Sequence, residues 1–444
     1  MSDHRSLKID HTQKRLGPIW LSRGVMPRNA LTLFLAGAMA IGFLNLLNLI
    51  QPLLLGEMLG MTSGEGDFTA NLYILTEITT LLIAAPLANL SDITGRRPIL
   101  SAGFLIICIT MLAIPTATTE VEYMAIRVAQ AIGIASCTTM IASLAADYPQ
   151  NPSRGKFIGL HGICTAIGVI VIGSGMTQLP RLFMSGGYSM QESINHTLWI
   201  AGGLAIIAMF ITFGGIRKGV ATDNRQKDDS FFKNARAALQ EIKGNQRLIL
   251  GCGATAISRG DLTVLASFFA LWVQKTGTDS GVESVVASAT AGKLFGLTQV
   301  AMLIAMPVIA VLADKLDRLN NLLLGVSLAA LGYFALALSP DPFNSPWIYL
   351  VILIAGVGEA AMIISVPTLI GQEAPAHVRG AIIGVAASFG AFGIIVTNKV
   401  SGYLFDNWDY QAPFMFMALL NSCMLIWALT VRILAPKPVV ARAV

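Results

Sequence analysis

Long apolar stretches alternate with short polar segments along almost the whole chain, and this pattern predicts a protein that spans a membrane. Each stretch is close to the ~20 residues that a helix needs to cross the hydrocarbon core of a bilayer. Helices are expected because a backbone exposed to lipid must satisfy its own hydrogen-bonding groups. We predict twelve spans, at residues 30–56, 70–91, 98–116, 121–146, 155–179, 197–216, 248–274, 290–313, 320–339, 347–371, 379–403 and 411–433.

The longest polar segment inside the chain, residues 217–247, divides these spans into two groups of six. Apolar residues recur in it at helical spacing and predict a short amphipathic helix on the inner membrane surface. We favour a simple linking role for this segment over a regulatory one. The predicted fold class is an all-α integral membrane protein with two six-helix bundles. Its predicted parts are an N-terminal tail (1–29), the N-terminal bundle (30–216), the linker (217–247), the C-terminal bundle (248–433) and a C-terminal tail (434–444).

The composition agrees with a membrane protein and argues against a large soluble one. The chain is 54% hydrophobic and only 12% charged, whereas soluble domains are about 25% charged. The five cysteines all lie in apolar stretches without the spacing of metal ligands. We therefore expect buried thiols, no metal site and no cofactor.

The positions of the basic residues predict the orientation of the chain. Most of the 30 lysine and arginine residues fall in the tails and loops of one side. By the positive-inside rule, this side is cytoplasmic, and it contains both termini. We expect a multi-pass protein of the inner (plasma) membrane. The formal net charge of +5 then reflects topology, and no nucleic-acid partner is expected.

Two short motifs each occur twice, which predicts that the chain arose by duplication. Ala88-Asn-Leu-Ser-Asp92-Ile-Thr-Gly95-Arg96-Arg97 follows the second span, and Ala310-Val-Leu-Ala-Asp314-Lys-Leu-Asp317-Arg318 follows the eighth. Asp147-Tyr-Pro follows the fourth span and precedes Arg154-Gly, and Glu373-Ala-Pro follows the tenth and precedes Arg379-Gly. The offset between copies is nearly the same for both motifs, as expected for two homologous halves.

These motifs resemble those of the major facilitator superfamily of secondary transporters. The loop signature of that family, Gly-x-Leu-x-Asp-x-x-Gly-Arg-Arg/Lys, is matched from Ala88 to Arg97, with alanine in the first glycine position. The second copy has Asp317 where the family has glycine. Arg127-Val-Ala-Gln-Ala-Ile-Gly resembles the fourth-span motif, whose arginine is linked to proton coupling. Asn-Leu-Ile-Gln-Pro at residues 48–52 resembles a first-span motif of drug–proton antiporters, but residues 168–175 lack the proline of the antiporter motif in span 5.

The resemblance implies that the repeated loop charges form a cytoplasmic gate. One latch would lie in each half of the chain, and a charge cluster set only by topology is the alternative. The predicted gate residues are Asp92, Gly95, Arg96, Arg97, Asp147 and Arg154 in the first half, and Asp314, Arg318, Glu373 and Arg379 in the second.

Polar side chains within the spans are the candidates for binding and coupling. An ionisable residue there costs about 2.5–3.5 kcal/mol, so it faces a water-filled cavity or a partner. Glu77 and Arg127 lie at similar depth and could pair, whereas Arg259 and Asp261 point in different directions on one helix. The predicted proton-coupling residues are Glu77, Arg127, His161, Arg259, Asp261 and Glu359. The predicted substrate-cavity residues are Asn45, Asn48, Gln51 and Gln130.

Among these residues, Asp261 and Glu359 are the preferred proton acceptors. Glu359 has no basic residue within one helical turn, so a proton is the simplest way to neutralise it. For each acid, a structural hydrogen bond between helices remains the alternative. For His161, helix packing is favoured over proton relay.

From these patterns we expect a secondary transporter that moves a small organic solute by alternating access, coupled to protons. Export, of multidrug type or of a metabolite, is favoured over its alternative, proton-coupled uptake of a sugar or organic anion. A non-transporting receptor or scaffold is a more distant alternative. The expected partners are the solute, protons and the lipid bilayer, and the protein is expected to be a monomer. The chain lacks the phosphate-binding loop of ATP-driven proteins, and we expect no enzymatic activity.

Overall fold

The computed structural model describes residues 11–219, 231–339, 341–375 and 378–434. Within these ranges, the side chains of residues 231–235 and of Asp314 are not described. The outer parts of both predicted tails, the middle of the linker and the side chain of one predicted gate residue, Asp314, therefore lie outside the described residues.

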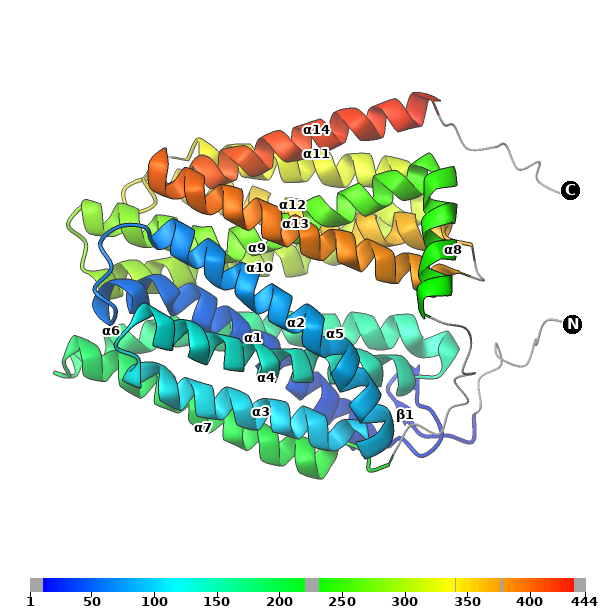
Figure 1. Cartoon of the computed structure of the whole chain (residues 1–444), viewed down its shortest axis with the longest axis horizontal. Helices are drawn as coiled ribbons and strands as arrows, with labels where there is room; N and C mark the ends of the chain where they lie inside the picture. Colours follow the sequence, from blue (N-terminus) through cyan, green and yellow to red (C-terminus); the bar gives the residue numbers. More distant parts are fainter. Residues whose placement is uncertain (1–10, 220–230, 340, 376–377, 435–444) are drawn as a thin grey trace, which may run out of the picture. The chain divides into compact units, whose positions relative to one another are not determined.

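Twelve helices in the described residues are long and apolar enough to cross a membrane, which confirms the predicted all-α membrane fold. The fifth span, Asn151–Ser185, extends well beyond the predicted 155–179. The helices that form the other eleven spans are α1 (Pro27–Glu57), α2 (Glu65–Thr94), α3 (Arg96–Ala113), α4 (Glu120–Asp147), α7 (Met190–Gly215), α9 (Gln246–Asp279), α10 (Ser284–Lys315), α11 (Arg318–Ala337), α12 (Trp347–Glu373), α13 (Arg379–Asn407) and α14 (Ala412–Leu434) (Figure 1). A short 3₁₀ segment, η2 (Ile114–Thr116), completes the third span.

The fifth span is built from several segments and changes its winding in the middle. It contains η3 (Asn151–Ser153), α5 (Arg154–Gly168), the π-helical η4 (Val169–Ser174), η5 (Met176–Gln178) and α6 (Leu179–Ser185). The Gly175 N–H donates to the Ile170 carbonyl oxygen, five residues earlier, over 2.9 Å. Such π segments are frequent at functional sites. This irregular turn lies where the antiporter motif would carry a proline.

Residue contacts divide the chain into two compact units, and each unit combines segments from both halves of the sequence. Unit 1 comprises Met1–Glu65, Leu75–Asn224 and Val273–Gly296, and unit 2 comprises Gly66–Ile74, Arg225–Trp272 and Leu297–Val444. The first turns of α2 thus belong to unit 2. The end of α9 and the start of α10 belong to unit 1.

A close helix pair recurs in the two units, as a duplicated chain predicts. In unit 1, a Cβ atom added at Gly168 of α5 would collide with the backbone of Ala38 in α1. In unit 2, a Cβ atom added at Gly393 of α13 would collide with the backbone of Ala256 in α9. Glycine at these positions lets the paired helices approach closely.

The predicted amphipathic helix is α8 (Phe231–Gly244), which packs against α13. Figure 1 shows it lying across the ends of unit 2 helices. Ala238 and Ile242 are buried in a hydrophobic cluster with residues of α9, α11 and α12, whereas Leu239 is exposed. Part of the apolar face therefore contacts protein, although we expected this face to lie on the membrane.

The predicted polar N-terminal tail contains a small ordered hairpin, which the hydrophobic pattern did not reveal. Strands β1 (Arg15–Leu16) and β2 (Ile19–Trp20) pair antiparallel. The Ser22 N–H donates to the Tyr148 carbonyl oxygen over 2.7 Å, and Leu21 is 0% exposed. The hairpin is therefore packed against the segment that joins α4 to α5.

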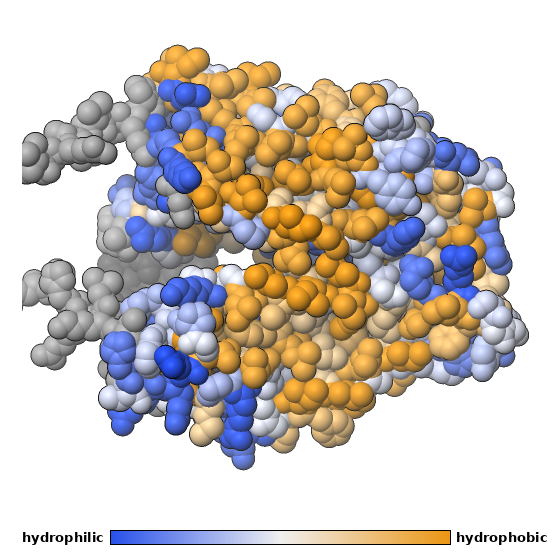
Figure 2. Space-filling view, turned by 180° about the vertical axis from the view of Figure 1, so that it is seen from behind, coloured by the Kyte–Doolittle hydropathy of each residue, from blue (hydrophilic) through white to orange (hydrophobic). Residues whose placement is uncertain are grey.

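The outer surfaces of the helices carry the side chains expected of a lipid-facing protein. Figure 2 shows hydrophobic side chains gathered along the middle of the helices and hydrophilic side chains at their ends. Large exposed apolar residues such as Phe210, Val308 and Ile426 contribute to this surface. Water-soluble proteins rarely expose so much apolar area, so we assign these faces to contact with lipid.

Candidate functional site

The two preferred proton acceptors lie in the same buried cluster of unit 2. The Tyr333 hydroxyl of α11 lies 2.7 Å from Glu359 Oε1 of α12 and 2.6 Å from the backbone carbonyl oxygen of Asp261 in α9. The side-chain amide of Asn421 in α14 donates to Asp261 Oδ1 over 2.8 Å. These four residues, which we call the acid cluster, are each at most 3% exposed.

The hydrogen bonds of the acid cluster require one more proton than the tyrosine can supply. A hydroxyl carries a single hydrogen, whereas a carbonyl oxygen and a carboxylate are both acceptors. Tyr333 can satisfy both contacts only if the Glu359 carboxyl is protonated and donates to the hydroxyl, which then donates to the Asp261 carbonyl. The geometry therefore fits a carboxyl group that holds a proton.

Three further oxygens of the acid cluster lack a hydrogen-bond partner among the described residues. They are Asp261 Oδ2, Glu359 Oε2 and Asn421 Oδ1. A buried charge without a partner is costly, so this cluster favours the neutral form of its carboxyl groups. Chemically, it can take up and release a proton inside the helical bundle.

Arg259, although close in sequence, does not join the acid cluster. Its side chain is exposed and passes Gly390 of α13, where an added Cβ would lie 3.0 Å from Arg259 Cγ. The Asp261 side chain instead accepts a hydrogen bond from Asn421, and the separation of Arg259 and Asp261 by two residues predicts such different directions. Sequence analysis did not select Tyr333 and Asn421, although polar residues in apolar helices were a usable signal.

The second polar cluster lies in unit 1 and combines Arg127 with three of the predicted cavity residues. Arg127 Nη1 donates to Gln130 Oε1 over 3.3 Å, and Nη2 donates to Asn48 Oδ1 and Gln51 Oε1 over 3.4 Å each. All four side chains are buried. We call these residues the arginine–amide cluster; they come from α1 and α4.

Asn45, Glu77 and His161 lie outside both clusters. The Asn45 amide donates to the Ile41 carbonyl oxygen of its own helix over 3.0 Å. The polar contacts of Arg127 within the described residues are to amides, so the ion pair considered with Glu77 does not form. His161 packs directly against Gly37 of α1, which agrees with the helix-packing interpretation.

The predicted latch of the first half contains an ion pair between Arg96 and Asp147. Arg96 also donates to the Ser143 carbonyl oxygen over 2.9 Å. Asp92 is exposed and forms no ion pair in the described residues, and exposed Arg154 donates to the Ala146 carbonyl oxygen over 3.0 Å. Asp92 and Arg154 therefore do not take part in the ion pair between Arg96 and Asp147.

Two neighbouring gate residues have local roles. Gly95 has a φ of +88° between α2 and α3, a conformation that favours glycine. The Arg97 guanidinium lies 4.1 Å from the centre of the Phe213 ring, a cation–π arrangement.

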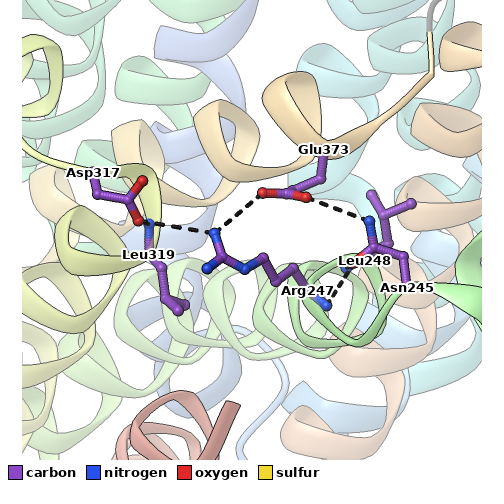
Figure 3. Close-up of polar contacts among 6 residues, drawn as sticks. All are labelled: Asn245, Arg247, Leu248, Asp317, Leu319 and Glu373. Atoms are coloured by element: carbon purple, nitrogen blue, oxygen red, sulfur yellow. Dashed lines mark hydrogen bonds and ion pairs between the residues drawn. The ribbon is translucent and has the colours of Figure 1, made fainter. Parts of the chain in front are cut away.

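The charge cluster of the second half is centred on Arg247, which sequence analysis did not select (Figure 3). Arg247 Nη1 lies 3.4 Å from Glu373 Oε1 and 3.9 Å from Asp317 Oδ2. The Asn245 amide donates to Glu373 Oε2 over 3.3 Å. Asp317, which replaces the glycine of the motif, also accepts from the Leu319 N–H at the start of α11 over 3.2 Å.

The arginines predicted for this second latch each donate to a backbone carbonyl oxygen. Arg318 donates to the Ala313 carbonyl oxygen, and Arg379 donates to the Ala374 carbonyl oxygen over 3.4 Å. The predicted gate residue Glu373 instead pairs with a base from α9 that was not among the predicted gate residues.

Ion pairs that we did not predict join segments from the two halves of the sequence within each unit. In unit 1, Lys275 at the end of α9 pairs with Glu65 at the start of α2. In unit 2, Lys399 of α13 pairs with Asp67 of α2. The Asp406 carboxylate accepts from the Gly66 and Asp67 N–H groups over 2.9 and 2.7 Å, which caps the N-terminus of α2.

Comparison with known proteins gives relatives over most of the chain. The magnetosome protein MamH of Paramagnetospirillum magneticum is 27% identical over 407 residues, covering 89% of this chain and 91% of MamH. The magnetosome protein MamZ of Magnetospirillum gryphiswaldense is 26% identical over 387 residues, and the match covers 83% of this chain and 57% of MamZ. Citrate exporter 1 of Aspergillus niger is 27% identical over 162 residues, which cover 35% of this chain and 30% of that protein.

Solved structures share the fold at low sequence identity. The nucleoside transporter NupG, in a mutant form, superimposes with a TM-score of 0.75 at 15% identity and covers 90% of this chain and 99% of NupG. A bacterial homolog of the human lysosomal transporter Spinster, in an inward-facing and unoccupied conformation, gives a TM-score of 0.62 at 16% identity, covering 92% of this chain and 96% of that chain. The family model described as Major Facilitator Superfamily matches residues 33–398. With the twelve membrane-spanning helices and the repeated loop motifs, this match shows that the chain belongs to the Major Facilitator Superfamily.

Proposed function

We propose that this protein is a secondary transporter that exports a small organic solute by alternating access in exchange for protons. The family and the fold are those of membrane transporters. In this proposal, it acts as a monomer in the inner membrane with both termini in the cytoplasm. The acid cluster carries the proton, and polar residues on the inner faces of the helices bind the solute.

The acid cluster is the observation that supports proton coupling. Its two carboxyl groups come from α9 and α12, and Tyr333 connects the Glu359 carboxyl group to the backbone carbonyl oxygen of Asp261. No basic side chain is bonded to either carboxyl group among the described residues. A proton is therefore the available counter-charge, and its gain or loss changes the hydrogen bonds between α9, α11 and α12.

Export is the direction that we favour over uptake. The first-span resemblance to drug–proton antiporters supports it, and so does the partial similarity to Citrate exporter 1. Proton-coupled uptake of a sugar or organic anion is the competing function. The direction of flux under an imposed gradient separates the two.

The test is accumulation by proteoliposomes from a compound library, with and without a pH gradient. Asp261→Asn and Glu359→Gln should abolish accumulation driven by the gradient and leave solute exchange largely intact, because each variant removes a titrating carboxyl group. Glu120→Gln, which changes an exposed acid at the start of α4, should behave like the original protein. Accumulation that is independent of the gradient, or undiminished in both buried variants, would reject the proton proposal.

A further inference from the structure

We propose that the arginine–amide cluster binds an anionic group of the transported solute, a carboxylate or a phosphate, with Arg127 as its counter-charge. This inference rests on the proposed transport function and names the chemical class of the solute. It assigns Arg127 to solute binding, whereas the family resemblance links this arginine to proton coupling.

The first support is the missing counter-charge of Arg127. Its side chain is only 5% exposed, and a guanidinium keeps its charge in proteins. The three hydrogen bonds to Asn48, Gln51 and Gln130 are 3.3–3.4 Å long, whereas charge-assisted bonds are about 2.7–2.9 Å. Arg127 Nε has no hydrogen-bond partner in the described part of the chain.

The other buried arginines show how this molecule usually compensates such a charge. Three arginines are buried in the described residues: Arg96, Arg127 and Arg247. Arg96 pairs with Asp147, and Arg247 pairs with Glu373. Arg127 differs from these two arginines because its hydrogen-bond partners are all neutral amides. No carboxylate among the described residues therefore compensates its positive charge.

The amides fit a site that holds a guanidinium in place without neutralising it. Their oxygens accept hydrogen bonds from three of the five N–H groups of Arg127, so Nε–H and one N–H of Nη1 remain to donate to a carboxylate or phosphate. Gln130 Nε2 is buried without a hydrogen-bond partner among the described residues and can donate to the same anion. The site thus offers positive charge and donors, and the described part of the chain supplies no carboxylate to occupy it.

The experiment measures the melting temperature of the purified full-length protein with added anions. The probes are citrate, succinate, benzoate and inorganic phosphate, with succinamide and benzamide as neutral analogues and sodium chloride to match ionic strength. We expect at least one anion to raise the melting temperature by roughly 5 °C at saturation, and the neutral analogues to have no effect. A response to phosphate alone or to carboxylates alone identifies which of the two groups is bound.

Two variants separate binding from a merely structural role of the arginine. Arg127→Gln should lose the anion response, and its ligand-free melting temperature should equal or exceed that of the original protein, because a buried uncompensated charge is removed. Arg181→Gln, at an exposed arginine of the same unit, should keep the response. Arg127→Lys keeps the positive charge and should retain part of the anion response.

Three results would overturn the inference. In the first, no anion raises the melting temperature of the original protein by more than it raises that of Arg127→Gln. In the second, the neutral analogues raise it as much as the anions do, and in the third, Arg127→Gln melts at a clearly lower temperature and still responds to anions. The outcome is independent of the proton proposal. Anion binding through Arg127 together with undiminished accumulation in Asp261→Asn and Glu359→Gln would reject only proton coupling. Gradient-driven accumulation without anion binding would reject only this inference.

Discussion

At the scale of single residues, the buried ionisable side chains fall into two groups, those with a partner of opposite charge and those with neutral partners. Arg96 and Arg247 have carboxylate partners from the chain itself. Glu359 and Arg127 have only neutral partners among the described residues. Because a lone charge is costly in an apolar interior, these two positions are suited to a proton and to an anionic ligand.

Tyr333 gives a direct test of the acid cluster. Tyr333→Phe removes the hydroxyl that bridges the Asp261 carbonyl and Glu359, and leaving a buried polar group unsatisfied costs about 1–3 kcal/mol. We expect gradient-driven accumulation in proteoliposomes to fall about 10-fold, since about 1.4 kcal/mol corresponds to a factor of ten. Tyr403→Phe, at a tyrosine that is 63% exposed, is the matched control. Equal accumulation in both variants would show that the bridge has no part in coupling.

At the scale of elements, capping side chains and the N-terminal hairpin stabilise the ends of the long helices. Asp406 caps the start of α2, and Asp317 caps α11 while it lies near Arg247. The N-terminal hairpin holds the segment between α4 and α5. There, burial raises the pKa of Tyr148 to about 12, so its hydroxyl stays neutral and accepts a hydrogen bond from the Arg217 N–H over 3.3 Å.

The hairpin should therefore contribute to stability. Leu21 is fully buried, and Leu→Ala at such a position costs about 2–5 kcal/mol. We expect Leu21→Ala to lower the melting temperature of the detergent-solubilised protein by several degrees. Leu239→Ala, at an exposed leucine of α8, should leave it nearly unchanged. If both variants melt like the original protein, the hairpin is not an integral part of the fold.

At the scale of the whole molecule, the two units hold complementary kinds of buried charge. Among the described residues, unit 1 contains an arginine without a carboxylate partner, and unit 2 contains two carboxyl groups without a basic partner. An exchanger built from these sites would move a monoanion outward and a proton inward. Each cycle would then carry two positive charges into the cell.

Membrane potential should therefore drive transport even without a pH gradient. One charge gains about 2.3 kcal/mol per 100 mV, so two charges gain about 4.6 kcal/mol. In proteoliposomes with a valinomycin-induced potassium potential and equal pH on both sides, we expect the flux of whichever probe anion stabilises the protein in the melting experiment to rise with the potential. Flux that does not depend on the potential would instead indicate electroneutral symport of a proton with the anion, which is the organic-anion form of the uptake alternative.

Features that depend on neighbouring residues in the chain were predictable from the sequence. Twelve apolar stretches predicted twelve spanning helices because hydrophobic length and backbone hydrogen bonding are local requirements in lipid. The repeated loop motifs predicted the duplication and the family, and Asn48, Gln51 and Gln130 were selected together from their polar side chains in apolar helices. The hairpin was missed because Ile19 and Leu21 form too short an apolar pattern to stand out.

Only the tertiary structure decided which charges meet. Tyr333 and Asn421 join Asp261 and Glu359 because the packing of α9, α11, α12 and α14 turns these positions toward one another. Arg247, rather than Arg379, pairs with Glu373 for the same reason. The period of a helix determines which residues share a face, but the packing of helices determines which faces meet. The sequence by itself therefore determined the helices and the candidate side chains, and the fold determined their partners.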